Sequence, residues 1–153
     1  MKIAIGSDHN AFELKEELKT YMIDEGYDVV DYGCHSCEAV DYPDVSFRVG
    51  NDIMKGEIDR GILICGTGIG VAIAAGKVPG IRAALCHDTY SAERAQLSNN
   101  AQILTMGAKV IGPEAAKKVL NAYLGASFAG GPSARKIQQI AEQEQAYLEQ
   151  ESR

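Results

Sequence analysis

The chain has 153 residues, of which 46% are hydrophobic and 24% charged, as expected for a globular domain with a buried core. Its net charge of -6 and its lack of a basic block disfavour nucleic acid and anionic membranes as partners, because clustered Lys and Arg provide much of the affinity for both. No apolar run approaches the roughly 20 residues of a membrane span, and the N-terminus turns polar too soon for a signal peptide, so we expect a cytoplasmic protein with free cysteines.

Short apolar runs alternate with segments of helical spacing. In chain order, we expect strands at 2–7, 27–33, 61–66, 81–88 and 101–107, with helices at 10–26, 41–57, 71–78, 89–98 and 113–125 between and after them. Repeated strand–helix alternation means parallel strands joined by right-handed crossovers. The sequence therefore predicts one α/β domain over 1–153, a Rossmann-like three-layer sandwich with a five-stranded parallel sheet and helices on both faces.

An additional helix is expected at 132–150, beyond the alternating pattern. Its apolar stripe is narrow and lies among many Gln and Glu residues; it comprises Ile137, Ile140, Ala141, Tyr147 and Leu148. The helix could cap the domain or pack on a second subunit, and we favour the subunit contact.

Residues 65–70, Cys-Gly-Thr-Gly-Ile-Gly, follow the third expected strand, at the sheet edge where ligands bind in such folds. Three glycines let the backbone turn sharply and approach a ligand, and the helix that starts near Ile69 offers amides and a dipole to an anion. The loop lacks the Lys-Ser/Thr of a Walker motif, and Val71 stands where a dinucleotide fingerprint needs its last glycine. A nucleotide-binding domain, with Asp88 on the ribose, remains an alternative.

Cys65 ends the apolar run immediately before these glycines. A cysteine at a strand end is most often a buried hydrophobic residue. Here the neighbouring amides favour an ionised thiolate, which could act as a nucleophile or as a base for a carbon-bound proton. The same amides could hold a developing enediolate oxygen. The loop thus combines a candidate base with a candidate oxyanion hole.

Asp8 and His9 follow the first expected strand, and His87 lies at the end of the fourth, so these side chains belong to the same edge. Cys34 and Cys37 form a C-x-x-C motif, but no second pair stands at ligand spacing, and the motif does not begin a helix after the first strand. We therefore expect neither a metal nor a redox role for them, and no cofactor.

Four stretches together resemble the family of ribose-5-phosphate isomerase B and galactose-6-phosphate isomerase. They are IAIGSDHNAFELK, DYPD, ILICGTGIGVAIAAGKVPGIRAALCHDTYSAERA and GAKVIGPEAAKKVL. The resemblance covers residues 1 to about 140. It implies a metal-free dimer or tetramer that interconverts an aldose and a ketose phosphate through a cis-enediol.

Site roles follow from the resemblance position by position. Cys65 would be the base that moves the proton between C1 and C2. The enediolate would be cradled by the amides of Gly66, Gly68, Ile69 and Gly70. Hydroxyl binding or proton relay would fall to Thr67, Asp8 and Asn99. Tyr42 would form a wall of the pocket, and His9 would contact the phosphate. The resemblance also implies that each site straddles two subunits, with Asn99 and the basic residues of the C-terminal half, Lys109, Arg135 and Lys136, supplied by the neighbour.

Departures from the family pattern concern the substrate. Ser98 stands where the family has the histidine credited with opening the sugar ring, and Lys109, Pro132 and Lys136 stand where it has arginines. A tetrose 4-phosphate cannot close a furanose because its O4 carries the phosphate. Erythrulose 4-phosphate is therefore one expected substrate. The other is ribose 5-phosphate, with His87 or a water opening its ring.

Overall fold

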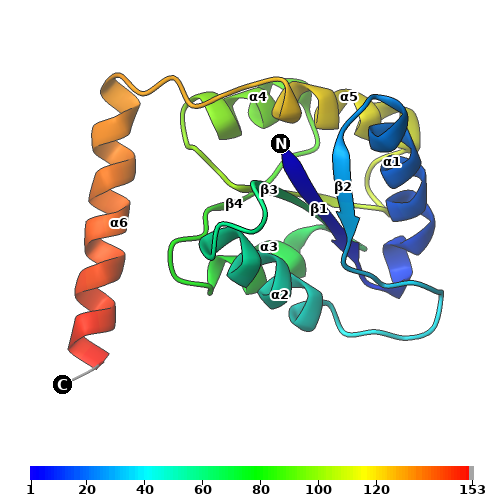
Figure 1. Cartoon of the computed structure of the whole chain (residues 1–153), viewed down its shortest axis with the longest axis horizontal. Coiled ribbons are helices and arrows are strands. Elements are labelled where there is room, and N and C mark those ends of the chain that lie inside the picture. Colours follow the sequence, from blue (N-terminus) through cyan, green and yellow to red (C-terminus); the bar gives the residue numbers. More distant parts are fainter. Residues whose placement is uncertain (152–153) are drawn as a thin grey trace.

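A computed structural model describes residues 1–151 (Figure 1). Five parallel strands form one sheet in the order β2-β1-β3-β5-β4, which confirms the predicted fold. The strands are β1 (Lys2–Ser7), β2 (Asp28–Asp31), β3 (Arg60–Cys65), β4 (Ala83–Leu85) and β5 (Ile103–Gly107). The helices are η1 (His9–Ala11), α1 (Phe12–Asp24), α2 (Tyr42–Met54), α3 (Ile69–Gly76), α4 (Thr89–Leu97), α5 (Pro113–Leu124) and α6 (Pro132–Glu151).

Helices cover the sheet on both faces: α1, α4 and α5 lie on one side and α2 and α3 on the other (Figure 1). Alternate residues of β1 enter the two cores, with Ile3 and Ile5 packed on the α1 side and Ala4 packed on the α2 side. The central strands are buried on both faces, which is why they read as unbroken apolar runs rather than as alternating ones.

Three strands are shorter than the sequence predicts, among them β5, which begins at Ile103 rather than at 101. We expected a strand over 81–88, but β4 is confined to Ala83–Leu85 at the edge of the sheet, where it pairs only with β5. After Leu85 the chain turns toward α4, whose first turn is capped by the Asp88 carboxylate accepting from the Ser91 amide at 2.9 Å. Similarly, β2 occupies Asp28–Asp31 rather than 27–33.

The order of the strands locates the ligand-binding edge. From β1 the chain moves outward to β2 and then returns to β3 on the other side of β1, so the switch point lies between β1 and β3. Ser7 pairs with Ile64, and Cys65 pairs with Gly107. The loops that follow β1, β3 and β5 therefore emerge next to one another.

Helix α6 stands away from the three layers (Figure 1). It meets the body of the protomer where the Gly80 amide donates to the Glu144 carboxylate at 2.9 Å. Two members of its predicted stripe, Ile140 and Tyr147, are 54% and 59% exposed. No helix within residues 1–151 is long and apolar enough to cross a membrane.

Candidate active site

Gly68 shapes the loop that follows β3. Its φ of +81° is in the left-handed region that favours glycine, and a Cβ there would lie 2.7 Å from the carbonyl carbon of Met106. The Gly68 carbonyl accepts from the buried Thr105 hydroxyl at 2.8 Å, while its amide donates to the Cys65 sulfur at 3.2 Å. A larger residue could not bring this amide onto the sulfur.

The turn gives the Cys65 and Thr67 side chains different hydrogen-bonding roles. The Cys65 side chain is 4% exposed, and its sulfur accepts the Gly68 N–H. The Thr67 oxygen accepts from the Ile69 amide at 3.2 Å, which leaves its hydroxyl hydrogen for a ligand. Helix α3 begins at Ile69, so its positive end faces this loop.

The loop after β5 braces the Cys65 loop from the side. The Ala108 amide donates to the Cys65 carbonyl at 2.9 Å, and the Lys109 amide donates to the Gly66 carbonyl at 3.0 Å. The aliphatic part of Lys109 passes beside Gly66, where a Cβ would lie 3.7 Å from its Cδ. The structure therefore places this cation beside the loop of its own protomer.

The loop after β1 contributes Asp8 and His9. The Asp8 amide donates to the Ile64 carbonyl at 3.3 Å, and its carboxylate accepts from the Asn10 amide at 3.0 Å. His9 Nδ1 lies 3.1 Å from the Val40 amide nitrogen and 3.3 Å from the Val40 carbonyl oxygen, and when it accepts from the amide, the ring N–H is on Nε2. His9 can thus offer an N–H to a phosphate oxygen.

Tyr42 is the first residue of α2, and its ring lies directly against Gly70 in the first turn of α3. The contact leaves no space for a side chain at position 70. Gly70 thus lets Tyr42 close one side of the loop, which is the position of a pocket wall.

Four predicted site residues lie elsewhere in the protomer. Ser98 and Asn99 follow α4 and precede the start of β5, at the edge of the sheet opposite Cys65. Arg135 and Lys136 are exposed residues in the first turns of α6. One protomer does not bring these four residues to the Cys65 loop.

His87 has a structural partner that the sequence did not reveal. Its Nε2 accepts from the Gly107 amide at 2.8 Å. Since an amide N–H can only donate, Nε2 carries no proton in this arrangement. The Nε2 lone pair is therefore used by the backbone at the end of β5, and Nδ1 is the ring nitrogen left for another contact.

An ion cluster around Asp31 was also missed. The fully buried Lys15 ammonium donates to both Asp31 oxygens, at 2.9 and 2.8 Å, and Lys19 donates to one of them at 2.9 Å. Asp31 also accepts from the Gly33 amide at 2.9 Å, and the Gly33 carbonyl accepts from Ser7 at 2.6 Å. The cluster thereby fixes the turn after β2 against the end of β1. The only signal in the sequence was a lysine beside Leu14 on the inward side of a helix.

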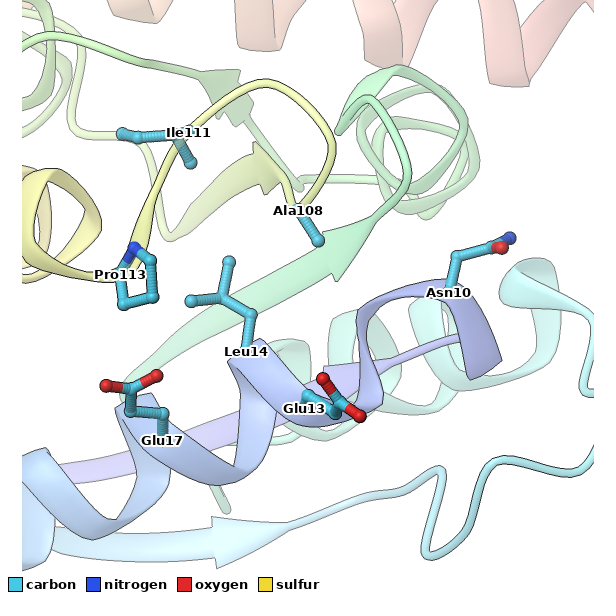
Figure 2. Close-up of a pocket in the computed structure, with 7 residues that line it drawn as sticks. All are labelled: Asn10, Glu13, Leu14, Glu17, Ala108, Ile111 and Pro113. Carbon is cyan, nitrogen blue, oxygen red and sulfur yellow. The ribbon is translucent and has the colours of Figure 1, made fainter.

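A hollow of about 230 Å³ lies beside this edge, between α1 and the segment that leads into α5 (Figure 2). Its apolar floor includes Leu14, Ile111 and Pro113, and the carboxylates of Glu13 and Glu17 stand at its rim. Two carboxylates would repel a phosphate. The hollow is therefore not the site that the loop of Cys65 forms.

All four cysteines are free thiols in the structure, with Cys37 exposed and the others buried. Burial, and to a smaller extent the nearby Asp88 charge, raises the pKa of Cys86 to about 11, so this thiol stays protonated at neutral pH. Within residues 1–151, no three His, Cys, Asp or Glu side chains are grouped as a metal site requires.

The chain is similar to known proteins over most of its length. The model of the Ribose/Galactose Isomerase family matches residues 3–140. The chain is 51% identical to a D-erythrulose-4-phosphate isomerase of Pectobacterium atrosepticum, over 92% of this chain and 93% of that protein. It is 48% identical to a ribose-5-P isomerase B of Listeria innocua, over 95% and 98%. The solved ribose-5-phosphate isomerase B of Clostridium thermocellum superposes with a TM-score of 0.94 at 46% identity, covering 96% of this chain and 99% of that one. The chain therefore belongs to the ribose/galactose isomerase family of sugar-phosphate isomerases.

Proposed function

We propose that the chain interconverts an aldose and a ketose phosphate through a cis-enediolate, with Cys65 as the base. The observation that carries this proposal is the hydrogen bond from the Gly68 amide to the Cys65 sulfur, in a loop of amides that has Lys109 beside it and follows a strand bonded to Asp8, the neighbour of His9 in the chain. A domain that only bound a phosphorylated ligand would need the glycines and the cations. It would have no use for a thiol held in this way.

In the proposed reaction, the Cys65 thiolate removes the proton from C2 of the aldose. Negative charge then develops on the substrate oxygens, where the amides of residues 66–70 stabilise it. The thiol returns the same proton to C1, which gives the ketose. Thr67 relays the hydroxyl proton between the two substrate oxygens: it gives its own hydrogen to one of them while the second lone pair of its oxygen takes the proton from the other, because the Ile69 N–H occupies only one lone pair. No external oxidant or reductant is required.

The preferred substrate in this proposal is the four-carbon pair D-erythrulose 4-phosphate and D-erythrose 4-phosphate. A cyclic substrate needs an acid–base group to open its ring. His87 is a poor candidate, because its Nε2 is occupied by the Gly107 amide and loss of its Nδ1 proton would leave an anionic ring. Ser98 has no ionisable group near neutral pH. An open-chain tetrose phosphate makes no such demand.

Parallel kinetics on D-erythrose 4-phosphate, D-ribose 5-phosphate and D-galactose 6-phosphate test the proposal, with deuterium entry from solvent as the signature of an enediol. We expect kcat/KM for the tetrose to exceed the pentose value by at least about tenfold. A pentose value equal to or above the tetrose value would refute the four-carbon preference. Failure to isomerise any of the three would favour the phosphometabolite- or nucleotide-binding alternative.

We further propose a homodimer or larger homo-oligomer in which each site combines two protomers. Two observations support it. Asn99 lies at the edge of its own sheet opposite Cys65, and α6 exposes an apolar stripe although it carries Arg135 and Lys136. A closed two-fold assembly can bring one protomer's α4 end and α6 to the Cys65 edge of the other.

Complementation should reveal such a shared site. Cys65→Ala and Asn99→Ala proteins are each expected to lose most activity. Unfolded and refolded together, they should form mixed dimers that retain one intact site, and recover roughly a quarter of wild-type activity by random pairing. Refolding each variant alone is the control. If dimers shown to contain one copy of each variant recovered no activity, the whole site would lie within one protomer.

A further inference from the structure

A second cleft, of about 270 Å³, lies along α4 and contains one cation. Its wall includes Cys86, Tyr90, Ser91, Arg94 and Asn99. The Cys86 thiol has its pKa raised to about 11 by burial and by Asp88, so this part of the wall is neutral at pH 7. Arg94 and Asn99 thus share one surface with no anion in its lining.

The Arg94 guanidinium is held in place without its charge being neutralised. Its Nη2 donates to the Ser98 hydroxyl oxygen, one helical turn further on. The backbone carbonyl of Arg94 accepts from the Ser98 and Asn99 amides at 2.9 and 3.3 Å. Among residues 1–151, no carboxylate lies within 4 Å of it. A neutral oxygen therefore orients the guanidinium, and the remaining N–H donors stay available for an anion.

We propose that Arg94 binds the phosphate of the substrate and that Ser98 is the residue that positions it. This inference rests on the proposed function, whose substrate carries a single strongly charged group. A guanidinium can hold two phosphate oxygens through parallel N–H donors, which a lysine cannot do. Arg94 would enter the site together with Asn99, because both belong to the same cleft. Ser98 then orients a cation and takes no part in proton transfer.

The test compares Arg94→Gln, Arg94→Lys and Ser98→Ala with wild type on the best substrate of the panel. Arg94→Gln should raise KM roughly 10- to 100-fold, the effect of losing a hydrogen bond to a charged group. Its kcat should change much less, because binding in the ground and transition states is lost equally. Inhibition by inorganic phosphate should weaken by a similar factor. Arg94→Lys should recover only part of the affinity, and Ser98→Ala should shift KM in the same direction by a smaller factor.

Lys118→Gln is the matched control, because it removes one exposed positive charge from α5 and should leave KM unchanged. Retained melting temperature in the Arg94 and Ser98 variants would show that α4 is intact. Equal KM and equal phosphate inhibition in wild type and Arg94→Gln would overturn the inference and leave the proposed function standing. A Ser98→Ala variant with lowered kcat and unchanged KM would also overturn it. If wild type isomerises none of the panel substrates, the proposed function itself has failed.

Discussion

Replacing Cys65 with serine is expected to lower kcat for sugar-phosphate isomerisation by about 10²- to 10⁴-fold, the usual contribution of a positioned acid–base group. Serine preserves the size of the side chain and can still accept the Gly68 N–H. A serine hydroxyl, however, is a far weaker acid than a thiol, so serine does not supply the anionic base that the proposed mechanism requires. KM should change little, since the phosphate contacts are untouched. Steady-state kinetics together with deuterium exchange at carbon measure both effects.

Two control variants separate this loss from general damage to a cysteine-containing protein. Cys37→Ser changes an exposed thiol in the loop before α2 and should be fully active. In that background, iodoacetamide should inactivate the protein by alkylating Cys65, and a sugar phosphate should slow the reaction by covering the loop. A Cys65→Ser protein that isomerises its substrate as fast as wild type would contradict the proposed mechanism. So would alkylation of Cys65 that leaves activity intact.

The parts of the fold that the sequence predicts are those with local causes. The central strands are buried on both faces, so β1 and β3 each form a continuous apolar run that glycine or polar residues end. Gly66, Gly68 and Gly70 predicted an unusually close turn because three glycines in five residues exceed what a simple turn needs, and at Gly68 a Cβ would meet the backbone of Met106. Parallel strands also bring their carboxyl ends to one edge, so the proximity of Asp8 and Cys65 followed from topology alone.

The parts that escaped prediction depend on contacts between distant elements. Nothing local in the sequence shows that β5 lies between β3 and β4, or that β4 is an edge strand only three residues long. His87 and Gly107 are 20 positions apart and meet only because β4 and β5 are neighbours. The same limit applies to the four residues that lie away from Cys65, since in the proposed assembly only a second copy of the chain would bring them to it.

Lys15 and Asp31 form another such long-range contact, and replacing Asp31 with asparagine should destabilise the fold strongly. Lys15 is fully buried, and removal of its main partner leaves a charge that is only partly compensated by Glu16 at 2.8 Å. Breaking a buried ion pair in this way typically costs 3–5 kcal/mol; because Glu16 remains, we expect a loss of about 3 kcal/mol in the free energy of unfolding at pH 7. Urea denaturation at equal protomer concentration measures it.

The pH dependence of that loss identifies its electrostatic origin. Burial alone would raise the pKa of Asp31, but hydrogen bonds from Lys15, Lys19 and the Gly33 amide outweigh it and hold the pKa below its usual range. A carboxyl group with a depressed pKa stabilises the folded state fully above its unfolded pKa of about 3.9, and this contribution disappears as the pH falls through the folded value. The difference between wild type and Asp31→Asn should therefore be constant from pH 7 to about 5, and should shrink steadily below about 4.

Asp44→Asn provides the matched control, because Asp44 pairs with Arg48 on an exposed surface and its side chain is 75% exposed. That pair should contribute less than about 1 kcal/mol at any pH, since water screens it and holding two long side chains costs entropy. If Asp31→Asn lost no more stability than Asp44→Asn, or lost the same amount at pH 3 as at pH 7, the buried ion cluster would not be what fixes the turn at Gly33. The hydrogen bond that the Ser7 amide donates to the Gly33 carbonyl, directly before Asp8 and His9, would then owe its position to the contacts between Ser7 and Cys34.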